Sequence, residues 1–98
     1  MAFSYKVHAA AGQSILAIAD SDVVGRAFEE GELSIEVRRD FYGGNLCSEK
    51  EIRELAASAT MINAVGRKIV ALLVRDGTVD KSMVLEIGGV SHAQAIKI

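Results

Sequence analysis

Several residue types are scarce or missing in this 98-residue sequence, which has no proline, no tryptophan and one cysteine. A single cysteine cannot form a disulfide within the chain, which excludes a disulfide-stapled secreted mini-protein and agrees with a reducing compartment. An excess of positive charge is missing as well. The 11 Lys and Arg stand against 13 Asp and Glu, and this net charge of −2 excludes a basic tail for nucleic acid.

Long apolar runs are also missing, although half of the residues are apolar and suffice for a core. The run at residues 69–74 is far shorter than the roughly 20 residues that a membrane-spanning helix needs. The first residues lack the basic head and apolar middle of a signal peptide. No linker or repeat divides the chain. We therefore expect a single domain over residues 1–98 that is cytoplasmic and does not contact a membrane.

Apolar periodicity predicts the elements of this domain. Alternating residues predict strands at 3–9, 14–20, 33–37, 84–87 and 90–98, and a short helical turn is expected from Asp20 toward Gly31. One helix begins at Ser48, which forms a capping-box motif with Glu51. The apolar face of a second helix comprises Ile62, Val65, Ile69, Leu72 and Leu73. Strands at both ends favour an α+β fold, a two-layer α/β sandwich with a mainly antiparallel sheet and the two central helices packed on one face.

The loop before the first helix contains Gly43, Gly44 and Asn45, and helix N-termini attract anions. No Gly-Lys-Ser/Thr sequence follows, and Glu49 and Glu51 already occupy the first turn of the helix. An ordinary glycine turn is therefore the alternative to a phosphate-binding loop.

The second helix offers another candidate for an anion site. If Asn63 caps this helix, exposed N–H groups and the side chains of Arg67 and Lys68 lie within its first two turns, and Gly66 lies on its apolar stripe. The alternative is a simple cap beside a solvated basic face. Arg26, Arg38 and Arg39 form the other basic cluster, for which a surface ion-pair network is the alternative.

His92 and Gln94 share one face of the last strand with Val90, Ile96 and Ile98, so their polar groups need partners in or near the core. A histidine there is either a satisfied structural residue or a general acid or base. Tyr42 either covers the core or stacks on a base.

No catalytic set accompanies His92. His8 has the opposite parity to the apolar face of its strand, and Cys47 has no neighbouring His or Asp that would activate a thiol. No Cys/His spacing fits zinc. We therefore expect no cofactor and no metal, and we expect a protein that is not an enzyme.

Three motifs together carry a resemblance to a known family: Phe-Tyr-Gly-Gly at 41–44, Asn-Ala-Val-Gly at 63–66 and Gly-Gly-Val-Ser-His-Ala-Gln at 88–94. In their order and spacing, over nearly the whole chain, the sequence resembles the archaeal proteins grouped as domain of unknown function 424. The resemblance implies an archaeal, cytoplasmic, stand-alone α/β sandwich, and no assigned activity. The family's recurrent positions match Tyr42, Gly43, Gly44, Asn63, Gly66, Gly88, Gly89, His92 and Gln94.

These features favour a non-enzymatic binding module. We expect RNA or a translation-related ribonucleoprotein as its partner, because a loop aromatic residue, scattered arginines and amide groups suit unpaired bases. One alternative is a small enzyme that acts on a nucleotide or other anionic metabolite, with His92 as acid or base. Another is a structural homo-oligomer or protein-interaction subunit. The expected binding residues are Tyr42, Gly43, Gly44, Asn45, Asn63, Gly66, Arg67, His92 and Gln94.

Overall fold

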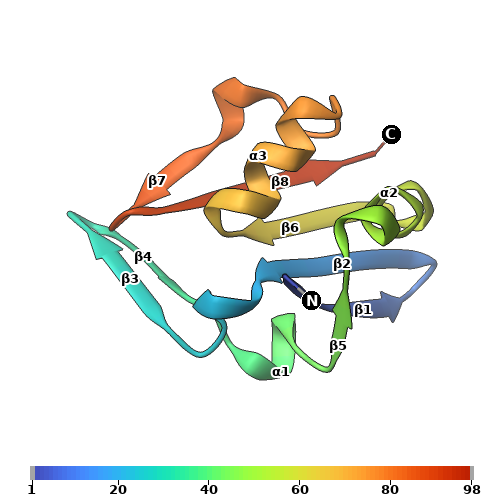
Figure 1. Cartoon of the computed structure of the whole chain (residues 1–98), viewed down its shortest axis with the longest axis horizontal. Coiled ribbons are helices and arrows are strands. Elements are labelled where there is room, and N and C mark those ends of the chain that lie inside the picture. Colours follow the sequence, from blue (N-terminus) through green and yellow to red (C-terminus); the bar gives the residue numbers. More distant parts are fainter. Residues whose placement is uncertain (1, 98) are drawn as a thin grey trace.

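The structure is a computed structural model that describes residues 2–97, so Ile98, the last residue of the expected final strand, lies outside the described residues (Figure 1). The strands are β1 (Phe3–Ala10), β2 (Gln13–Asp20), β3 (Ala27–Glu30), β4 (Leu33–Glu36), β5 (Asn45–Cys47), β6 (Met61–Val65), β7 (Leu85–Ile87) and β8 (Val90–Ile96). The helices are α1 (Arg39–Tyr42), α2 (Glu49–Ser58) and α3 (Arg67–Arg75), with 3₁₀ turns η1 (Ser21–Val23) and η2 (Lys81–Met83).

A six-stranded sheet in the order β5-β1-β2-β6-β8-β7 forms the centre of the molecule (Figure 1). Its neighbouring strands are antiparallel except for the parallel pair β2 and β6. The α+β class and the mainly antiparallel sheet are therefore confirmed. As its apolar sequence indicates, β2 lies inside the sheet, where both of its faces are covered.

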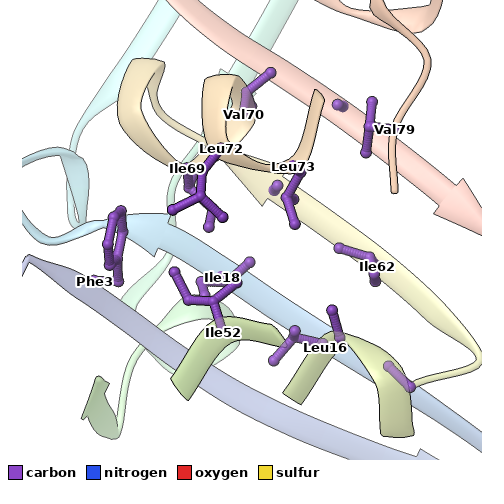
Figure 2. Packing of buried hydrophobic residues seen from close by; sticks show 14 of the residues in the cluster. Phe3, Leu16, Ile18, Ile52, Ile62, Ile69, Val70, Leu72, Leu73 and Val79 are labelled. Carbon is purple, nitrogen blue, oxygen red and sulfur yellow. The ribbon is translucent and has the colours of Figure 1, made fainter. Parts of the chain in front are cut away.

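Helices α2 and α3 both pack on one face of this sheet, as the sequence predicts. Figure 2 shows Ile52 of α2 and Ile69 and Leu73 of α3 meeting Ile18 and Ile62 of the central strands. All five side chains are almost completely buried. More of the buried apolar side chains lie in this layer than on the opposite face of the sheet, and burial of each contributes roughly 1.5–3 kcal/mol. The capping box at the start of α2 is confirmed: Ser48 and Glu51 form its two reciprocal contacts.

The opposite face of the sheet is covered only in part, by α1 and by the two-stranded sheet β3–β4. Ala17 and Ala19 of β2 lie under this cover, and their small side chains leave room for Tyr42 and Val37. Toward the start of β6 and the end of β8 this face is open, since Ile96 is 68% exposed.

The expected start of the second helix is wrong, because residues 61–65 form β6 and the helix α3 begins only at Arg67. A spacing of three between Ile62 and Val65 fits a helix, but the segment is a central strand that is buried on the face toward the helices and partly buried on the other. Gly66 separates the two elements with a positive φ of 132°, a conformation that L-residues rarely adopt.

The expected helical turn between Asp20 and Gly31 is also wrong beyond residue 23. Only η1 is helical there, and residues 27–30 form β3, which pairs with β4 around a turn at Gly31. The segment 41–45, expected as a loop, contains the end of α1 and the start of the edge strand β5. No helix within residues 2–97 is long and apolar enough to cross a membrane.

Candidate functional site

A polar cluster lies on the partly open sheet face, where β6 and β8 approach α1. The hydroxyl of Tyr42 donates a hydrogen bond to Oδ1 of Asn63 over 2.6 Å. Nε2 of His92 lies 3.2 Å from the same oxygen. Gln94 is paired directly with Asn63 across the two strands and is exposed. We call the residues Tyr42, Asn63, His92, Gln94 and Ile96 the Asn63 face.

Strand pairing and small side chains place these groups. Asn63 lies between Ala17 of β2 and Gln94 of β8, and Ala17 is completely buried. The absence of a larger side chain at Ala17 lets the ring of Tyr42 lie against the sheet, where it is 4% exposed. The hydroxyl of Ser4 donates to the carbonyl oxygen of Tyr42 over 2.9 Å and holds α1 on β1.

The protonation states within the cluster follow from burial. Burial raises the pKa of the Tyr42 hydroxyl to about 12, so this group remains a donor at neutral pH. Burial lowers the pKa of the His92 imidazole, which favours the neutral ring. Because an amide oxygen can only accept, the contact with Asn63 assigns the proton to Nε2 of His92. The Asn63 oxygen is thus held by two donors, and its amide nitrogen remains available to donate.

The border of the Asn63 face contains residues that the sequence analysis did not assign to a site. The ring of His8 stacks on that of Phe41, with ring centroids 4.6 Å apart and an interplanar angle of 19°. Nε2 of His8 lies 2.9 Å from the carbonyl oxygen of Phe41. Lys6 is exposed. It pairs with Ala17 across β1 and β2, and Ala17 pairs with Asn63 across β2 and β6, so the three residues share one face of the sheet. Only the register of β1 against β2 and the placement of α1 could have identified this border.

Gly43, Gly44 and Asn45 do not join the cluster. Asn45 begins the edge strand β5, where it pairs with Tyr5, and its side-chain nitrogen donates to the Tyr5 carbonyl over 3.4 Å. A Cβ atom at Gly43 would lie 2.6 Å from the carbonyl oxygen of Arg39, so this glycine permits the close end of α1. The packing at the end of α1 thus accounts for Gly43 without a ligand.

Asn63 does not cap a helix, and the anion site expected at the start of α3 is already filled. The carboxylate of Asp20 accepts hydrogen bonds from the backbone N–H groups of Lys68 over 3.0 Å and of Ile69 over 2.9 Å. Burial raises the pKa of this carboxyl, against the opposing effect of the two amide hydrogen bonds. Arg67 lies on the helix-covered side with Ser91, whereas alternation along β8 turns His92 to the other face. Arg67 is therefore not part of the Asn63 face.

Groups suited to covalent or metal chemistry do not accompany the cluster. Cys47 is completely buried, and burial raises the pKa of its thiol to about 11, so it remains protonated. Within residues 2–97 no group of three or more His, Cys, Asp or Glu side chains could hold a metal ion. Arg38 forms an exposed ion pair with Asp40 over 2.9 Å, which matches the ion-pair alternative for this residue of the cluster, whereas the guanidinium of Arg26 lies over the ring of Phe28.

Comparisons with known proteins place the chain among proteins without assigned function. The profile of a family described as "Protein of unknown function (DUF424)" matches residues 8–98. A solved structure of an uncharacterised conserved protein from the archaeon Methanopyrus kandleri is 23% identical, with a TM-score of 0.76. The match covers 98% of this chain and 93% of that one, and it confirms the fold. The comparison with curated proteins gives no match.

Proposed function

The chain belongs to the DUF424 family, whose description assigns no activity, and we propose from its geometry that it is a non-enzymatic module that binds unpaired bases of RNA on the Asn63 face. The proposal places the protein in the cytoplasm, with RNA free or within a translation-related ribonucleoprotein as its partner. The expected family resemblance is confirmed, but it concerns ancestry and fold, so the binding argument rests on the site.

The orientation of the Asn63 amide is the observation that carries the proposal. Its oxygen accepts from Tyr42 and from His92, so the side chain cannot rotate freely and its nitrogen points away from both donors. The neighbouring amide of Gln94 is exposed. Two adjacent neutral amides, one of them held in place before binding, suit the edge of an unpaired base better than an isolated charge.

The surroundings of the amides also suit a nucleotide. Ile96, which is 68% exposed, and the half-buried Met61 pair across β6 and β8 and offer an apolar platform beside the amides. Lys6 lies on the same side and supplies a positive charge for a phosphate. Because this charge is local and the chain is acidic overall, we expect modest affinity with a shallow dependence on salt.

The enzyme hypothesis has less support from the same contacts. A general base is commonly oriented by a carboxylate, whereas His92 contacts the amide oxygen of Asn63. Burial favours the neutral ring, whose single N–H is directed at Asn63, so His92 offers Nδ1 as an acceptor, and an acceptor is equally useful for recognition. The geometry therefore favours a binding role for this histidine.

Fluorescence anisotropy with a labelled pool of single-stranded RNA, about 12 nucleotides long and at about 50 mM salt, tests the proposal. We expect binding by the native protein and about tenfold weaker binding by Gln94→Ala, since one bidentate contact to a base contributes about 1–3 kcal/mol. Gln13→Ala is the matched control, because Gln13 is an exposed glutamine at the start of β2, outside the Asn63 face.

A second variant separates recognition from folding. Asn63→Asp retains an oxygen that accepts from Tyr42 and His92 but removes the N–H donor and adds a charge that repels phosphate. We expect a folded protein that no longer retains RNA. The absence of RNA binding by the native protein at low salt, or equal binding by the Gln13 and Gln94 variants, would refute the proposal. Dimerisation through Ile96, detected by sedimentation, would assign this face to self-association instead.

A further inference from the structure

A second surface lies on the helix-covered side of the sheet, between α3 and the segment from η2 to β7. A groove of about 510 Å³ is hollowed there, and we call it the α3–β7 groove. Its apolar lining consists of Val70, Ala71, Val74 and Val84. The two termini of α3 and the start of η2 place three basic residues around this lining.

Positive charge dominates the border of the groove. Arg67 begins α3, Arg75 ends it and Lys81 begins η2, and all three are exposed. Among residues 2–97, Glu86 is the only acidic residue that lines the groove, and its carboxylate accepts a hydrogen bond from Ser91 over 2.6 Å. Arg75 pairs with Glu49 outside the groove over 2.7 Å, at a well-exposed site. In a chain of net charge −2, this concentration of cations is local and needs an explanation.

Stability of the helix does not provide that explanation. Arg67 lies in the first turn of α3, where the positive end of the helix dipole disfavours a cation. The first turn contains no acidic residue, and the cap is supplied from outside the helix by Asp20. None of the ion pairs within residues 2–97 includes Arg67 or Lys81. Their charges are therefore available for a partner.

We propose that the α3–β7 groove binds an acidic amphipathic segment of a partner protein, with apolar side chains on the valines and carboxylates against Arg67 and Lys81. The apolar lining favours a peptide over RNA, because the groove presents no aromatic side chain on which a base could stack. The nine residues of α3 are about 13 Å long, so a segment of roughly three helical turns would span the groove. This site is separate from the Asn63 face and does not depend on the function proposed for it.

Anisotropy with labelled designed peptides of about 14 residues tests this proposal. The probe peptide carries Leu at helical spacing on one face and Glu or Asp on the other. A second peptide contains the same residues in an order that abolishes the apolar face, and a third has Lys in place of its acidic residues. We expect the full-length protein to bind the first peptide, at least about tenfold more weakly the second, and not the third.

Arg67→Glu is the decisive variant, because an acidic residue in the first turn of α3 is favourable for the helix. We expect its melting temperature to change little, because the favourable helix dipole is offset by repulsion from the Asp20 carboxylate, and its affinity for the acidic peptide to fall by about tenfold or more. Lys50→Glu is the matched control: it reverses the same charge in the first turn of α2, outside the groove, and leaves binding unchanged. The proposal would be overturned if Arg67→Glu bound the acidic peptide as tightly as the native protein, or if the two acidic peptides bound equally well. It would also be overturned if single-stranded RNA bound through Arg67 while the peptide did not.

Discussion

Replacement of Gly66 by alanine tests how the structure joins β6 to α3. Gly66 has a φ of 132°, and a Cβ atom there would lie 2.4 Å from Cγ of Asp20. The Asp20 carboxylate cannot move away freely, because it accepts the N–H groups of Lys68 and Ile69. The substitution therefore strains the backbone and displaces the helix cap at the same time.

The expected loss is the sum of these two effects. A side chain at a positive φ costs about 1–2 kcal/mol, and loss of an N-terminal cap costs about 1–2 kcal/mol. We expect Gly66→Ala to lower the free energy of unfolding by about 2–4 kcal/mol, and the melting temperature by roughly 10–30 °C for a domain of this size. Gly77→Ala is the control, since Gly77 has a φ of 77° but no atom within 4 Å of an added Cβ. Its cost is limited to the backbone strain.

Urea denaturation followed by circular dichroism measures both variants, alone and in the background of Asp20→Ala. In that background the carboxylate is gone and only the Cβ of residue 20, 2.8 Å from the added Cβ, remains close, so Gly66→Ala should cost less than in the presence of Asp20, and the two substitutions are not additive. A Gly66→Ala variant no less stable than Gly77→Ala would refute the reasoning. So would an equal cost of Gly66→Ala in the presence and absence of Asp20.

Three further predictions concern the cluster and the buried thiol. Tyr42→Phe removes one of the two donors to Asn63, and we expect urea denaturation to show a loss of about 1 kcal/mol; no loss would mean that this hydrogen bond contributes nothing. Burial lowers the pKa of His92 below the value of 6.5 that the imidazole has in the unfolded chain. The unfolded state therefore takes up a proton first as the pH falls, so the contribution of neutral His92 to stability is complete above pH 6.5 and is lost as the pH falls through the folded pKa. The difference in unfolding free energy between the native protein and His92→Gln, measured from pH 7.5 to 5, should therefore shrink as the pH falls, and a constant difference would contradict the assignment. Burial raises the pKa of the Cys47 thiol to about 11, so a thiol reagent at pH 8 should label the unfolded protein and leave the native protein unlabelled.

Local patterns were sufficient for elements whose periodicity has one interpretation. The capping box of Ser48 and Glu51 starts α2, and residues with alternating polarity form β1 and β4. The apolar positions of residues 61–65 fit a helical period as well as a central strand, so periodicity alone does not decide between the two. The carboxylate that caps α3 belongs to Asp20, 48 positions before Lys68, so no local pattern could identify it.

The candidate site shows the same division. The parity of β8 placed His92 and Gln94 on one face, but the sequence assigned Asn63 to a helix terminus, where its amide would have no contact with either. The register of β6 against β8 sets Asn63 opposite Gln94, and the position of α1 over Ala17 brings Tyr42 to the same oxygen.

The sequence by itself therefore determined the α+β class, the membership of a family and the residue types that could form a site, because these depend on composition, periodicity and motif order. Tertiary structure alone decided which of these residues meet. Asn63 is 21 residues from Tyr42 and 29 residues from His92 in the chain, yet its side chain contacts both. These contacts arise only because β6 pairs with β8 and α1 packs on the sheet.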